Sequence, residues 1–142
     1  MSVVPGAIDA LVARLAARPG LAGVQIFDGP EAKFPEQDFI AVGLSPEDLE
    51  TPATRQPAGP ATTSESAEIT CAIRSWDGTT DIRSRRLRAY QLLDEIRSEI
   101  DGDNTLGGAV DQAELTGSTY MPAQGKRGVV VDVVLTVQVT RF

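Results

Sequence analysis

The chain contains no histidine, the side chain that most often serves as a general base or metal ligand near neutral pH. Its absence excludes every pairing of a nucleophile with an imidazole base. Cysteine occurs once, at Cys71, so no internal disulfide can form, as is typical of a reducing compartment. The alternation around Cys71 places it on the apolar face of a strand, where a thiol is ordinarily inert.

Long apolar runs are also missing. No stretch approaches the roughly 18 residues of a membrane helix, and no basic segment precedes an apolar run at the N-terminus. We therefore expect folding in the cytoplasm and no membrane partner. Thirteen basic against 20 acidic residues give a formal charge of −7, which disfavours wrapping around nucleic acid because phosphates select basic surfaces.

Cofactor motifs are incomplete in this chain. Asp101-Gly102-Asp103-Asn104 starts like a calcium loop, but its sixth position is Leu106 instead of glycine and its twelfth is Gln112 instead of glutamate. Gly107-Gly108 lacks the Lys-Ser/Thr of a phosphate-binding loop. We expect no catalytic residues, no metal and no cofactor. A hydrolase that uses two carboxylates brought together by folding stays open as an alternative.

Hydrophobic periodicity predicts one α+β domain over residues 1–142, a size typical of a single domain. We expect helices at 5–17 and 80–100, strands at 21–27, 39–44, 66–76, 109–115 and 128–140, and a loop at 121–126. The order α-β-β-β-α-β-β favours a mixed or antiparallel sheet of about five strands packed by two helices. The expected buried stripe of the long helix is Ile82, Ala89, Tyr90, Leu93, Ile96 and Ile100.

Two segments are unusual. The last strand alternates strictly over 128–140, longer than the usual limit of about ten residues, which predicts a strong bend or a reach beyond its own sheet. The segment 45–64 is rich in proline, with Pro52 and Pro57 near its centre, so no helix or ladder strand is expected there. It is either a surface insertion or an arm that orders against a partner chain.

The long helix carries its charges in an unexpected order. Basic residues stand near its start and acidic ones near its end: Arg83, Arg85, Arg86 and Arg88, then Asp94, Glu95 and Glu99. The helix macrodipole prefers the reverse by about 0.3–1 kcal/mol for a suitably placed charge. This is either a solvated face or a basic patch that meets the acidic patch of the next subunit in a ring. Trp76 either caps the core or anchors an interface.

Several stretches, taken in order, resemble the tail terminator proteins of siphophages, particularly those that infect actinobacteria. They are VQIFDGP at 24–30, DFIAVG at 38–43, the run from Glu65 through Trp76 and Asp77 into DIRSRRLRAY at 81–90, TLGGAV at 105–110, and the C-terminal valine-rich strand. The resemblance spans nearly the whole chain. The segment 45–64 does not match the family pattern.

The resemblance implies a structural protein of the virion tail or neck. In that family a ring, typically a homo-hexamer, caps the head-proximal end of the tail tube, stops polymerisation of the major tail tube protein and joins the tail to the head–tail connector. It implies no catalytic residues. Genomic DNA would pass through the lumen without sequence-specific binding, and a negative lumen would favour passage because like charges repel.

Three other functions remain open. The nearest is another neck or head-completion connector protein. A second is a ligand-binding module in which 45–64 closes as a lid over the sheet, and the third is the carboxylate hydrolase. A small molecule bound to the purified protein would favour the second, and a cleft with two close carboxylates the third.

Overall fold

The computed structural model describes residues 3–29, 38–44, 65–76, 81–125 and 128–142. In chain order its elements are α1 (Val4–Ala17), the 3-10 helix η1 (Pro19–Leu21), β1 (Gln25–Asp28), β2 (Phe39–Leu44), β3 (Glu65–Trp76), α2 (Ile82–Gly102), β4 (Gln112–Gly125) and β5 (Gly128–Arg141). The predicted α+β class and the order α-β-β-β-α-β-β are confirmed. Among the described residues, no helix is both long and apolar enough to cross a membrane.

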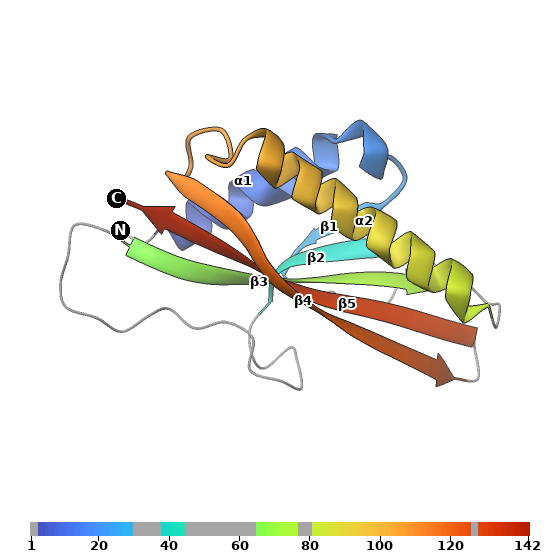
Figure 1. Ribbon diagram of the computed structural model, residues 1–142. Coiled ribbons are helices and arrows are strands. Elements are labelled where there is room, and N and C mark those ends of the chain that lie inside the picture. The colour runs from blue at the N-terminus through green and yellow to red at the C-terminus, as the bar shows by residue number, and fades with distance from the viewer. Residues whose placement is uncertain (1–2, 30–37, 45–64, 77–80, 126–127) are drawn as a thin grey trace.

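The five strands form one mixed sheet in the order β1-β2-β3-β5-β4. β1 and β2 are parallel, and every other neighbouring pair is antiparallel. Both helices lie on the same face of the sheet, with α2 running above β5, β3 and β4 and α1 above β1 and β2 (Figure 1). The helix-free side is called the open face below.

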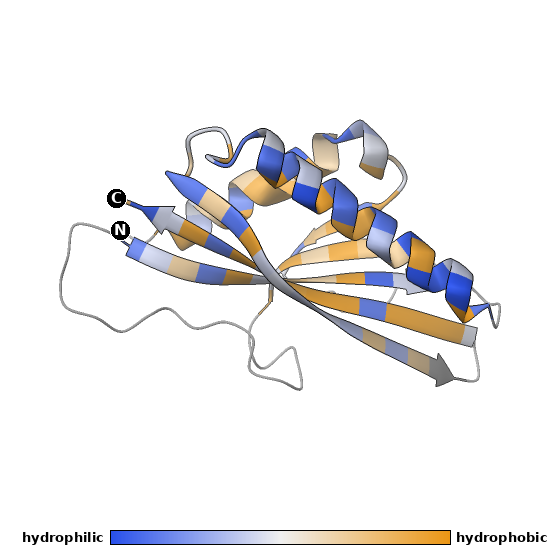
Figure 2. Ribbon diagram, viewed as in Figure 1, coloured by the Kyte–Doolittle hydropathy of each residue, from blue (hydrophilic) through white to orange (hydrophobic). Residues whose placement is uncertain are grey.

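The core lies between the helices and the sheet. Alternate residues of β3 and β5 point into it, among them Ile69, Cys71 and Ile73, because side chains on a strand alternate between its two faces. Figure 2 shows the apolar inner sides of both helices turned toward these strands. Leu11 and Ile96 are fully buried, and burial of such a side chain stabilises the fold by about 1.5–3 kcal/mol.

The long strand β5 stays within its own sheet. It pairs with β3 from Val130 to Arg141 and with β4 from Gly128 to Thr140, so its whole length has ladder partners. The prediction that it reaches beyond the sheet is therefore wrong. Figure 1 instead shows β4 and β5 twisting together as a ribbon, as long paired strands do.

Three predicted boundaries are also wrong. The expected strand at 109–115 begins at Gln112, and the expected loop from 121 belongs to β4 as far as Gly125. Polar residues and Pro122 obscured the signal, but an edge strand tolerates a proline because one of its sides needs no ladder partner. The strand expected from residue 21 begins at Gln25, because Pro19–Leu21 forms the 3-10 turn.

Helix α2 starts at a side-chain cap. Asp81 accepts hydrogen bonds from the backbone N–H of Ser84 at 3.2 Å and from its hydroxyl at 2.6 Å. These bonds, that of the Ser84 hydroxyl first, lower the pKa of the Asp81 carboxyl. Of the predicted buried stripe, Ala89, Leu93, Ile96 and Ile100 are buried. Ile82 and Tyr90 are exposed, and Leu92, which was not predicted, is buried.

Candidate interaction surface

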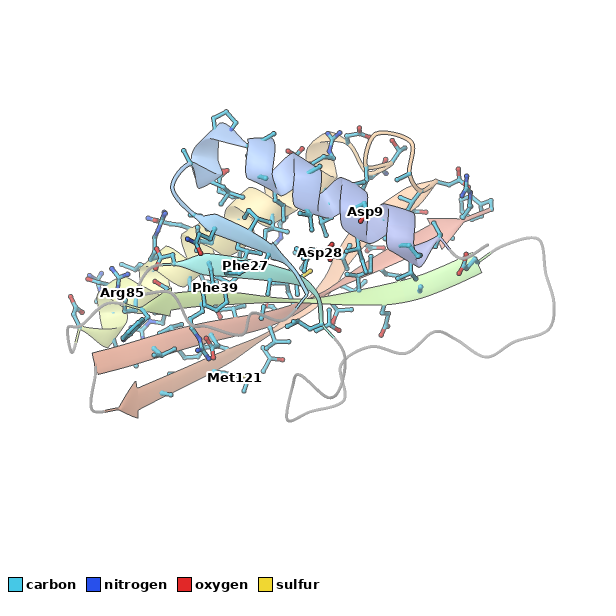
Figure 3. All side chains as sticks on the ribbon, turned by 180° about the vertical axis from the view of Figure 1, so that it is seen from behind. Asp9, Phe27, Asp28, Phe39, Arg85 and Met121 are labelled. Carbon is cyan, nitrogen blue, oxygen red and sulfur yellow. The ribbon has the colours of Figure 1, made fainter. Side chains whose placement is uncertain are left out.

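The basic start of α2 contacts its own subunit. Asp38, just before β2, accepts a hydrogen bond from Arg88 Nε at 2.9 Å and lies 3.6 Å from Arg85 Nη1. Ser75, at the end of β3, donates to Asp38 at 2.9 Å and accepts from Arg85 at 3.1 Å. Figure 3 shows Arg85 at this end of the sheet. Arg85 and Arg88 thus fasten α2 to β2 and β3.

The acidic end of α2 is neutralised in the same way by α1 and the residue after it. Arg18 Nε lies 2.6 Å from Glu95 Oε2, and Arg14 Nη2 lies 3.3 Å from Glu99 Oε2. Gly20 leaves room for the Glu95 carboxylate, since a Cβ at that position would overlap it. The reversed charge order of α2 is therefore compensated inside the subunit.

These contacts divide the predicted interface residues into two groups. Arg85, Arg88, Glu95 and Glu99 are occupied by partners within the chain. Among the described residues, Arg83 and Arg86 form no salt bridge, and Asp94 has only a surface contact of 3.8 Å with Arg97. Among the described residues, the charges of this second group are therefore available to bind another molecule.

The available residues share one flank of α2. A helical period of 3.6 residues aligns positions three and four apart. We call the resulting row the α2 stripe, and its members are Arg83, Arg86, Tyr90, Asp94, Arg97 and Asp101. The Tyr90 ring lies 6.2 Å from that of Tyr120 on β4, so the stripe faces the β4 side of the molecule.

Strand β4 is an open edge of the sheet. Within the described residues it pairs with β5 alone over its 14 residues. Half of the backbone groups of such a strand point away from the sheet and can pair with another strand. Met121 is 40% exposed on this strand, and Thr119 and Ala123 are exposed as well.

The open face of the sheet carries a second set of contacts. Arg74 on β3 forms two hydrogen bonds to Asp132 on β5 and lies over the ring of Phe39 on β2, 5.9 Å from its centre. Phe39 in turn packs edge-on against Phe27, as Figure 3 shows, with 5.5 Å between ring centres. These contacts link side chains of four strands, β1, β2, β3 and β5, on the open face.

The other predicted interface residues are not placed at a contact. Trp76 ends β3 opposite Val130 and is half-buried, so its role as core cap or interface anchor stays a prediction. Pro52 and Pro57, with the rest of 45–64, lie outside the described residues.

The pairing of the two helices has a signal in the sequence that we did not use for prediction. Arg14 in α1 and Arg18 just after it have the same four-residue spacing as Glu95 and Glu99 on α2, a pattern that favours contact between the two segments. Asp38 and Asp132 have no such signal, because they meet their arginines only after the strands have paired.

Among the described residues, no group of three or more acidic or cysteine side chains is placed to hold a metal ion. Burial raises the pKa of the Cys71 thiol to about 12, so it stays protonated and unreactive at neutral pH. In comparisons with known proteins, no family model matches the chain, and no curated protein matches it.

Proposed function

We propose that this protein is a structural subunit of a siphophage virion that assembles into a ring, of six copies, on the head-proximal end of the tail tube. The observation that carries the assembly role is the edge of β4, which has no second strand partner among the described residues, beside the available charges of the α2 stripe. A long open edge recruits other strands, and Pro122 and the irregularity between Leu115 and Gly117 interrupt the edge of β4 only in part.

The ring and its position rest on the resemblance to tail terminators. The resemblance implies a sheet packed by helices, and the α+β fold of this chain agrees with it. In this role the ring would stop polymerisation of the major tail tube protein and offer its other face to the head–tail connector. The net charge of −7 supports free passage of DNA through its lumen, since like charges repel.

The test is the mass of the purified protein by light scattering, with negative-stain images of the same fractions. We expect ring-shaped particles built from six copies, and end-on binding of these particles to siphophage tail tubes. Binding to head connectors without any binding to tubes would instead favour the neck-connector alternative. DNA retention should be weak at physiological salt, and tight binding would contradict the proposed lumen.

A further inference from the structure

We infer that the edge of β4 and the α2 stripe form a two-fold interface with a second copy of this chain. In this interface β4 pairs antiparallel with β4 of the second copy, which joins the two five-stranded sheets into one. The helices of both copies then lie on the same face, with the two α2 stripes side by side. The inference goes beyond the proposed ring: it assigns this edge to a two-fold contact, so the contacts between neighbouring subunits of a ring would use other surfaces.

The charge order along the stripe favours a second copy as the partner. Arg83 and Arg86 precede Tyr90, whereas Asp94 and Asp101 follow it. At a rise of about 1.5 Å per residue, Arg86 and Asp94 lie about 6 Å on either side of Tyr90. A two-fold axis near Tyr90 reverses the direction of the second stripe, so Arg86 of each copy faces Asp94 of the other.

The outer charges are less well matched. Arg83 and Arg97 lie about 10 Å on either side of Tyr90, so the axis places Arg83 of each copy opposite Arg97 of the other, and Asp101, about 6 Å further along, lies within reach of both arginines. The existing contact between Asp94 and Arg97 does not prevent Asp94 from pairing with Arg86 of the second copy, because both side chains are largely exposed and such surface pairs are weak. The match of the surface to itself therefore rests on the inner pairs, Arg86 with Asp94.

The sheet edge has a compatible centre. Tyr120 of β4 lies beside Tyr90, so the same axis passes near both rings and gathers four tyrosines from two copies. Figure 1 shows α2 beginning near the end of β4 and running in the opposite direction to it. One two-fold axis can therefore place β4 antiparallel to β4 of the second copy and α2 antiparallel to α2 of the second copy. An antiparallel pair of edges would use the outward backbone groups near Ser118 and Tyr120.

This contact differs from one that closes a ring. An interface between identical patches is satisfied by two copies, whereas a ring needs two different patches that meet head to tail. The two-fold contact therefore produces a dimer, or two rings joined back to back where rings are present.

A charge exchange tests the inference. The dissociation constant of the two-fold contact is measured by light scattering on dilution for Arg86→Asp, for Asp94→Arg and for the double variant. Each single change brings like charges together twice per interface, so we expect about tenfold weaker association or more. The double variant restores opposite charges at both places, so we expect its dissociation constant to lie within about threefold of that of the original protein.

Two further variants separate charge from backbone pairing. Asp9→Arg, at an exposed position of α1, changes the charge as Asp94→Arg does and should leave association unchanged. Ser118→Pro removes a donor on the side of β4 where Pro122 is tolerated, and should weaken association while the fold, followed by circular dichroism, is kept.

Single variants that associate normally, or a double variant as weak as the singles, would overturn the inference. The second result would show that the stripe meets a different surface of its partner, because the double variant restores only a contact in which Arg86 of one copy faces Asp94 of the other. Neither result bears on whether rings form, which images decide separately.

Discussion

Arg74 and Asp132 lie directly opposite each other on β3 and β5, with Nε 2.7 Å from Oδ1 and Nη2 2.8 Å from Oδ2. This two-bond geometry is the strongest common form of side-chain ion pair. The hydrogen bond to Asp132 also raises the pKa of the Arg74 guanidinium, against the opposing effect of burial. The pair fixes the register of the two central strands on the open face.

Asp132→Ala should therefore lower the free energy of unfolding by about 1–3 kcal/mol, because it removes charge-assisted hydrogen bonds from a half-buried guanidinium. Unfolding in urea, followed by circular dichroism, measures the change. Asp9→Ala removes an exposed carboxylate, and its free energy of unfolding should stay within about 0.5 kcal/mol of that of the original protein. Equal stability of the two variants would show that the pair contributes nothing.

The two groups of arginines on α2 should respond differently to charge reversal. Arg85→Glu places a carboxylate against Asp38 and Ser75, so we expect a loss of about 2 kcal/mol or more in unfolding free energy. Arg83→Glu changes an exposed position and should cost about 0.5 kcal/mol or less. Thermal unfolding of both variants makes the comparison, and a similar loss in each would contradict the division of the charges.

Cys71 should be inert in the folded protein. It is fully buried in β3, and burial raises its pKa to about 12, so almost no thiolate is present at pH 8. A thiol reagent added to native protein should react only as fast as the protein unfolds, and at once in denaturant. Rapid labelling without denaturant would show that the sheet opens locally near Cys71.

Asp103 should make the protein less stable in acid. Its carboxylate accepts hydrogen bonds from the hydroxyl and backbone N–H of Thr105 and from the backbone N–H of Gly107, and these lower its pKa. A lowered folded pKa contributes stability above the unfolded value of about 3.9, and this stability is lost as the pH falls through the folded pKa.

The comparison with Asp103→Asn tests that assignment. The variant should be less stable than the original at pH 6, and the difference should shrink as the pH falls below about 4, because the original then protonates its carboxyl. Urea unfolding across this pH range gives the measurement. A constant difference at all pH values would mean that the ionised form of Asp103 is not what stabilises the turn.

The sequence was sufficient for the element order because apolar periodicity is a local property. Alternation along 128–140 and the run from Ala89 to Ile100 identify a strand and a helix without any partner. Strand β4 was misjudged because an edge strand needs little apolar alternation, and it is held by hydrogen bonds to β5.

The charges on α2 show the limit of the same reasoning. Their order along the helix was visible, but whether Arg85 or Arg83 was engaged depended on Asp38, which reaches the helix only through strand pairing. Helical spacing alone placed Arg83, Arg86 and Asp94 on one flank. Only the contact between Tyr90 and Tyr120 shows that this flank faces the open edge.

The most direct test of the assembly role is the mass of the purified protein in solution, measured by light scattering across a range of concentrations together with negative-stain images. We expect ring-shaped particles of six copies, or of twelve where two rings associate through their β4 edges. A protein that stays monomeric at every concentration, with no rings in the images, would contradict the proposed assembly.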